Sequence, residues 1–98
     1  MAKNPSVSRT VQFKLFGEFD IDRRSEVKEL FDQLSGDAPI VIDLQEVTYV
    51  DSSFLAELAL LRNRLSNVDI TLEGATPNLR RLFQLMNYDK LFHLNNAS

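Results

Sequence analysis

The chain has 98 residues, of which 44% are hydrophobic and 26% are charged, and its formal net charge at pH 7 is −3. This length suffices for one compact domain and is too short for two. The acidic balance argues against a nucleic-acid-binding surface, and the lack of cysteine excludes disulfides and thiolate chemistry.

The sequence shows no pattern typical of a signal peptide or of a membrane-spanning helix. No apolar run approaches the length of a helix that spans a bilayer. Residues 1–10 are polar and lack the apolar stretch of a signal peptide, and we expect them to form a flexible lead-in. We therefore expect a cytoplasmic protein with no nucleic-acid partner and no direct membrane insertion.

Two kinds of periodicity mark the first half of the chain. Val11–Leu15 alternates apolar and polar residues as a half-buried strand does. Phe16–Asp20 continues in an extended pattern across Gly17, as a second short strand or a bulge. A helix is then predicted between Asp22, a suitable N-cap, and Gly36, a stop signal. Its apolar residues recur at helical spacing: Val27, Leu30, Phe31 and Leu34.

The second half alternates strands and helices in the same way. Ile40–Leu44 is a nearly continuous apolar run, which is typical of a strand covered on both faces. Thr76 and Pro77 suit the N-cap and the first position of a helix. The remaining expected elements are a helix over residues 52–65, a strand over 68–72, the helix after Thr76, a short strand over 91–94 and a frayed end over 95–98.

This order of elements favours an α/β fold. Strands that alternate with helices imply a small, mostly parallel sheet with short right-handed crossovers. No internal repeat or linker divides the chain, so residues 11–94 are expected to form one domain.

The most informative motif is Asp51-Ser52-Ser53, which lies where the apolar strand pattern meets the second long helix. Free backbone N–H groups and the positive end of the helix dipole favour anions at such a place. A serine there can cap the helix, bind a phosphate or accept a phosphoryl group. Capping is the structural explanation; a phosphoryl group on Ser52 would instead change the charge of this surface with little change to the fold.

Other kinds of site find little support. Nothing in the spacing brings His93, the only histidine, to Ser52 or Ser53 for serine–histidine catalysis. The chain lacks the set of Cys and His ligands that a zinc ion needs, and it has no glycine-rich phosphate-binding loop. We therefore expect no enzymatic activity and no cofactor.

The carboxylates near strand ends leave two readings open. Asp20, Asp43 and Asp51 could gather at the carboxyl ends of parallel strands and bind Mg²⁺. Alternatively, Asp22 and Asp51 cap helices while the others are exposed. The capping interpretation is favoured.

Four segments, in order and with matching spacing, resemble the STAS domains, and among them the bacterial anti-sigma factor antagonists. They are Phe16-Gly17-Glu18-Phe19-Asp20, Val41-Ile42-Asp43-Leu44-x-x-Val47, Val50-Asp51-Ser52-Ser53, and Leu72-x-Gly74-Ala75-x-Pro77-x-Leu79-Arg80-Arg81-Leu82-Phe83. The resemblance covers residues 11–94 and implies a small mixed sheet, mostly parallel, with the helices packed mainly on one face.

The resemblance also implies a function. The serine that follows the aspartate is the phosphoacceptor in these antagonists, and here it is Ser52. The unphosphorylated antagonist binds an anti-sigma factor that is also a serine kinase, and phosphorylation breaks that complex. A metal-dependent serine phosphatase then restores the antagonist. Asp20, Asp51 and Ser53 would help to form the docking surface of a protein that is monomeric when isolated.

The chain departs from the antagonists at Phe54, where they usually have glycine. If Phe54 is exposed, it can anchor a partner, because aromatic residues often dominate interface energies; if it is buried, it only enlarges the core. A second departure is Asn87-Tyr88, where Gly-Leu is common. The alternative function is that of a constitutive STAS subunit, either in a lipid-transport ABC complex or in a signalling scaffold.

Overall fold

The computed structural model describes residues 10–95, and within this range strands and helices alternate as the sequence predicts. The predictions for residues 1–9 and 96–98 lie outside the described part. The α-helices and strands are β1 (Val11–Phe19), α1 (Arg24–Asp32), β2 (Ile40–Val50), α2 (Ser52–Arg64), β3 (Ile70–Glu73), α3 (Pro77–Leu85) and β4 (His93–Asn95). Two 3₁₀ turns accompany them, η2 (Ile21–Arg23) and η3 (Tyr88–Lys90).

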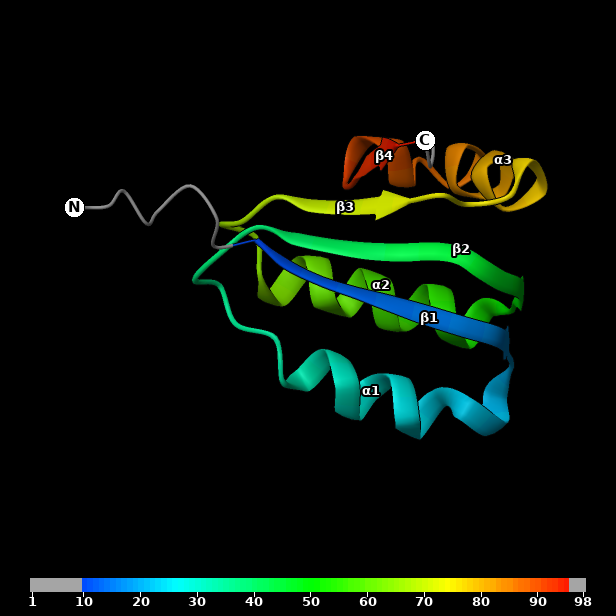
Figure 1. Ribbon diagram of the computed structural model, residues 1–98, viewed down its shortest axis with the longest axis horizontal. Coiled ribbons are helices and arrows are strands. Elements are labelled where there is room, and N and C mark those ends of the chain that lie inside the picture. The colour runs from blue at the N-terminus through cyan, green and yellow to red at the C-terminus, as the bar shows by residue number, and fades with distance from the viewer. Residues whose placement is uncertain (1–9, 96–98) are drawn as a thin grey trace.

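The strands form a sheet in the order β1-β2-β3-β4, and each neighbouring pair is parallel. Because successive strands are added in one direction, right-handed crossovers place the connecting helices on the same face. Figure 1 shows β1, β2 and β3 side by side, with α1 and α2 running along them. The predicted α/β fold with a parallel sheet is confirmed. No helix in residues 10–95 is long and apolar enough to cross a membrane.

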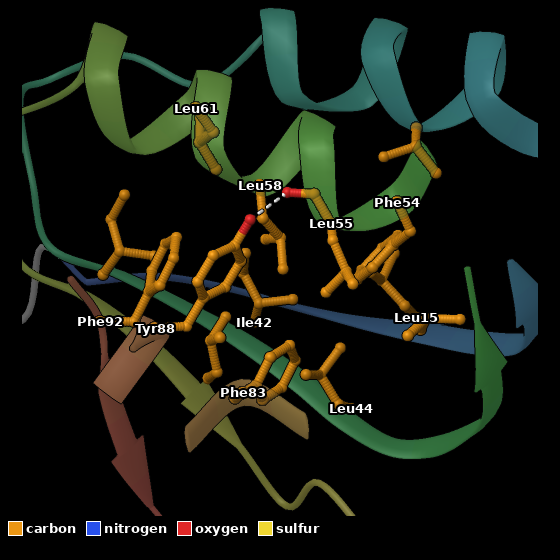
Figure 2. Packing of buried hydrophobic residues seen from close by; sticks show 14 of the residues in the cluster. Leu15, Ile42, Leu44, Phe54, Leu55, Leu58, Leu61, Phe83, Tyr88 and Phe92 are labelled. Atoms are coloured by element: carbon orange, nitrogen blue, oxygen red, sulfur yellow. Dashed lines mark hydrogen bonds between the residues drawn. The ribbon is translucent and has the colours of Figure 1, made fainter. Parts of the chain in front are cut away.

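The core fills the space between the sheet and the helices. Strand β2 directs Ile40, Ile42 and Leu44 into it, and all three are buried. Figure 2 shows the side chains of α2 facing those of the strands, with Phe83, Tyr88 and Phe92 joining from the C-terminal part of the chain. The Tyr88 hydroxyl donates a hydrogen bond of 2.7 Å to the Leu55 carbonyl oxygen, which satisfies the polar atom of a buried ring.

The prediction that the 40–44 strand is covered on both faces is wrong. Burial alternates along it: the intervening residues, Val41 and Asp43, point to the opposite face and are partly exposed. Side chains of a strand alternate between its two faces, and the described helices cover one of them. Val41 lengthens the apolar run without belonging to the core.

The two alternatives for residues 16–20 resolve in favour of a bulge. Strand β1 is continuous from Val11 to Phe19, and its register with β2 shifts between Lys14 and Phe16 and again between Gly17 and Glu18. Gly17 has a φ of 88°, a conformation that side chains disfavour. The Arg23 guanidinium secures the irregular segment by donating to the carbonyl oxygens of Phe16, at 2.7 Å, and Glu18, at 3.1 Å.

The observed N-cap agrees with the predicted one for α3 and differs from it for the first helix. Thr76 caps α3 by accepting from the Leu79 N–H, with Pro77 at the first helical position, as predicted. The prediction that Asp22 caps the first helix is wrong. The Asp20 side chain instead accepts from the Asp22 N–H, at 3.0 Å, and starts the turn η2. Helix α1 then continues from Arg24 without a side-chain cap.

Candidate functional site

The candidate site lies where β1 and β2 end together. Phe19 and Val50 are partners in the parallel register, and the Asp51 N–H donates a hydrogen bond of 3.1 Å to the Phe19 carbonyl oxygen. Asp20 and Asp51 directly follow these two paired residues. The structure therefore brings them side by side at the carboxyl ends of adjacent strands, where sites of α/β proteins commonly lie.

Asp51 is the N-cap of α2. One of its carboxylate oxygens accepts from the N–H groups of Ser53, at 2.9 Å, and Phe54, at 3.3 Å, and from the Ser53 hydroxyl, at 2.5 Å. The hydrogen bond from the Ser53 hydroxyl, followed by the backbone N–H groups of Phe54, Ser53 and Ile21, lowers the pKa of Asp51 below its ordinary value. Asp51 is therefore ionised at neutral pH, and its predicted capping role is confirmed.

The two serines have different environments. Ser53 is buried, with 6% of its surface exposed, and its hydroxyl is held by Asp51. Ser52 is exposed, and within residues 10–95 its hydroxyl has no hydrogen-bond partner. Because Asp51 supplies the cap, Ser52 has no structural role of that kind. Of the two hydroxyls, only that of Ser52 is open to another protein.

Phe54 takes the second of its two alternatives and lies in the core. Only 1% of its surface is exposed, and its ring centroid lies 5.1 Å from that of Phe19 and 6.3 Å from that of Phe31. An exposed aromatic anchor for a partner is therefore not present at this position. The ring links the start of α2 to strand β1 and helix α1.

Asp43 does not join the other carboxylates. Strand β2 runs on to Val50, so Asp43 lies in its middle, where its carboxylate is 3.9 Å from the Lys14 ammonium nitrogen and accepts from the Gln45 N–H at 2.8 Å. The alternative in which it gathers with Asp20 and Asp51 is wrong, because the strand is longer than its apolar run. Residues 10–95 contain no group of three or more His, Cys, Asp or Glu that could hold a metal ion.

Comparison with known proteins now decides the family. A family model described as "Mlab, STAS domain" matches residues 5–94. The chain belongs to the STAS domain family. A STAS-domain containing protein of Pseudomonas aeruginosa (strain UCBPP-PA14) is 29% identical over 89 residues, which are 88% of this chain and 86% of that protein.

Two solved structures share the STAS fold. The anti-sigma factor antagonist SpoIIAA in its unphosphorylated form superposes with a TM-score of 0.69 at 21% identity, over 91% of this chain and 80% of that chain. The STAS domain of a SulP transporter from Vibrio cholerae gives a TM-score of 0.69 at 12% identity, over 90% of this chain and 73% of that chain. At these identities the likeness concerns the fold.

The sequence interpretation missed one feature of this STAS domain next to the site. A groove lies between the last residues of β2 and helix α3, and it is lined by Val47, Thr48, Tyr49, Val50, Thr76, Asn78, Leu79 and Leu82. Of these residues, Tyr49 is 53% exposed. The available signal was an aromatic residue two positions before Asp51, but the sequence does not show that this residue is exposed.

The charge on Asp51 predicts a pH-dependent stability. A carboxylate whose pKa is lowered by folding stabilises the native state above its unfolded pKa, and this contribution is lost as the pH falls through the folded value. Asn also caps helices but carries no charge. In urea titrations, Asp51→Asn should therefore cost most at pH 7, and the difference from the wild type should shrink below about pH 4. A difference that stays constant with pH would contradict this account.

Proposed function

We propose that this STAS domain is a phospho-switched anti-sigma factor antagonist, and that Ser52 is its phosphoacceptor. In its unphosphorylated form it binds an anti-sigma factor that is also a serine kinase, as a cytoplasmic monomer and a binding module without activity of its own. The observation that carries the proposal is the exposed Ser52 hydroxyl, which is not needed as a helix cap because Asp51 caps α2. The fold shared with the antagonist SpoIIAA supports it.

The chemistry of the switch follows from the surroundings of Ser52. A kinase transfers the γ-phosphoryl group of ATP to the hydroxyl oxygen, which loses its proton, and ADP leaves. The phosphoserine carries about two negative charges beside the carboxylates of Asp51 and Asp20. The helix N-terminus tolerates this charge, but a docked partner meets added bulk and charge. A metal-dependent serine phosphatase returns the hydroxyl by hydrolysis.

The remaining partner-binding residues are part of the same proposal. Asp20 and Asp51 follow the paired ends of β1 and β2 and would present their carboxylates to the partner there, near the exposed Ile21. Ser53 would act through Asp51, whose position its hydroxyl fixes. Phe54 would act only by packing beneath this surface.

The test is to incubate the full chain with its cognate serine kinase and ATP and to map the phosphate by mass spectrometry. We expect one phosphate on Ser52, none in Ser52→Ala, and normal incorporation in Ser66→Ala, an exposed control. Ser52→Asp should also weaken binding of the kinase. Phosphate at another residue, or full binding by Ser52→Asp, would sink the proposal.

A constitutive subunit of a transport complex is the second candidate. The match to the Mlab family model and the fold shared with the STAS domain of a SulP transporter favour it. In that case the chain would copurify with a permease and an ATPase, for example those of a lipid-transport ABC complex. Ser52→Asp and Ser52→Ala would then both leave this assembly unchanged. The phospho-switch instead requires the two variants to differ in how strongly they bind their partner.

A further inference from the structure

The groove between β2 and α3 has an uncharged, largely apolar lining. Its walls are the apolar side chains of Val47, Val50, Leu79 and Leu82, and its polar groups come from Thr48, Tyr49, Thr76 and Asn78. None of these residues carries a charge at neutral pH. The volume of the groove is about 450 Å³, which is within the range of cavities that receive ligands and side chains.

The groove adjoins the candidate phosphoacceptor along the chain. Val50 lines it, Asp51 follows, and Ser52 begins the helix α2. Tyr49, another lining residue, is 53% exposed, and Ile21, whose backbone N–H lies at the Asp51 carboxylate, is 62% exposed. An exposed aromatic side chain thus lies three residues before Ser52, and a partner that covers the groove at Val50 lies two residues along the chain from Ser52.

This position explains how a phosphate could break a complex on a surface that is already acidic. Asp51 is charged but makes its hydrogen bonds within the protein. A phosphate on Ser52 would instead lose water against an apolar partner, and burying an unpaired charge is costly. Phosphorylation beside a hydrophobic contact and next to carboxylates is disruptive for both reasons.

We propose that the groove binds an uncharged, apolar helix face of the partner protein, and that this contact is what phosphorylation of Ser52 removes. The inference rests on the proposed function for the identity of the partner. Because the lining carries no charge, the groove favours apolar side chains over charged ones. A groove between a strand and a helix also suits a bound helix with apolar residues at positions i, i+3 and i+4.

The first experiment is photo-cross-linking of the full chain in the cell that encodes it. Benzoylphenylalanine replaces Thr48, which is exposed in the groove, or Asn63, which is exposed near the other end of α2, about 16 Å along the helix. We expect the probe at residue 48 to label one protein, within an apolar helical segment, and the probe at residue 63 not to label it. Adding Ser52→Asp should abolish the cross-link.

The second experiment measures affinity between the purified chain and the protein so identified. Thr48→Glu and Thr48→Lys should each weaken binding by about tenfold or more, because a charge of either sign is disfavoured in an apolar contact. Asn63→Glu and Asn63→Lys should have no effect. Unchanged circular dichroism and melting temperature would show that all four variants fold.

The outcomes separate the two proposals. If the partner binds in a Ser52-sensitive way but the Thr48 variants keep wild-type affinity, the groove is not the contact and the proposed function stands. If only Thr48→Glu weakens binding, the contact is electrostatic and the inference is overturned. If the cross-link from residue 48 persists in Ser52→Asp, the groove binds a partner but the phospho-switch is wrong. A cross-link that maps to a charged segment, or none at all, also overturns the groove.

Discussion

Phe54→Ala is expected to lower the free energy of unfolding by about 3–5 kcal/mol, the usual cost of removing a buried phenylalanine ring. The ring is 1% exposed and packs against Phe19 and Phe31. A domain of this size is stable by only about 5–15 kcal/mol, so the variant should be marginal at best. Urea denaturation followed by circular dichroism measures the change.

Two variants of helix α2 serve as controls. Phe54→Leu keeps most of the apolar volume and should cost clearly less than Phe54→Ala. Leu60→Ala removes a side chain that is 56% exposed on the same helix and should change the stability little. Equal losses for Leu60→Ala and Phe54→Ala would contradict the packing described above.

The burial of Phe54 changes what its departure from the antagonist pattern means. A glycine at this point allows a close approach of the partner's backbone, and the phenylalanine was expected to anchor another partner if exposed or to enlarge the core if buried. Because the ring turns into the core, the surface at the start of α2 is left to Asp51 and the exposed Ser52. The phenylalanine therefore changes the packing beneath the site more than the groups exposed on its surface.

Local patterns predicted the parts of the fold that depend on near neighbours. Thr76-Pro77 predicted the start of α3 correctly because a helix cap involves residues only three positions apart. The parallel sheet followed from the alternation of strands and helices. These features need no knowledge of which distant segments meet.

The errors concern choices that tertiary contacts make. Asp20 and Asp22 are both good cap residues, and only the position of Asp20 beside the end of β2 selects it to start η2. Asp43 was placed at a strand end because the apolar run stops there, whereas pairing with β1 carries β2 on to Val50. The motif located Ser52 and Ser53, but which of them is exposed depends on the orientation of α2 against the sheet.

Helix α2 also shows a limit of reading burial from residue type. It buries Glu57, with 5% of its surface exposed, while Leu60 is 56% exposed. The Glu57 carboxylate is satisfied by Arg24 of α1, whose Nε lies 2.8 Å from the carboxylate oxygen Oε2. The two residues are 33 positions apart, so no local pattern connects them. This ion pair joins the two helices that lie next to each other on the sheet.

Removing one member of this pair should therefore cost more than removing an exposed ion pair. Arg24→Met keeps the length and helix propensity of the side chain but leaves the Glu57 carboxylate buried without its partner. We expect a loss of about 2 kcal/mol, less than the ~3–5 kcal/mol of a fully buried pair, because water screens the partly exposed Arg24. Lys28→Met, which removes an exposed pair with Asp32, should change the stability little.

The double variant Arg24→Met, Glu57→Met tests whether the ion pair itself adds stability or only avoids the cost of a buried, unpaired carboxylate. With both charges gone, no carboxylate is left buried, and the methionine side chains can fill the space between α1 and α2. We expect the double variant to recover most of the stability that Arg24→Met loses, and a double-mutant cycle in urea measures this coupling. Additive losses would mean that Glu57 is satisfied without Arg24, through the other cations that line the hollow between these helices, Lys28 and Arg64. Recovery would show that the pair adds little net stability and that Arg24 mainly removes the cost of burying the Glu57 carboxylate.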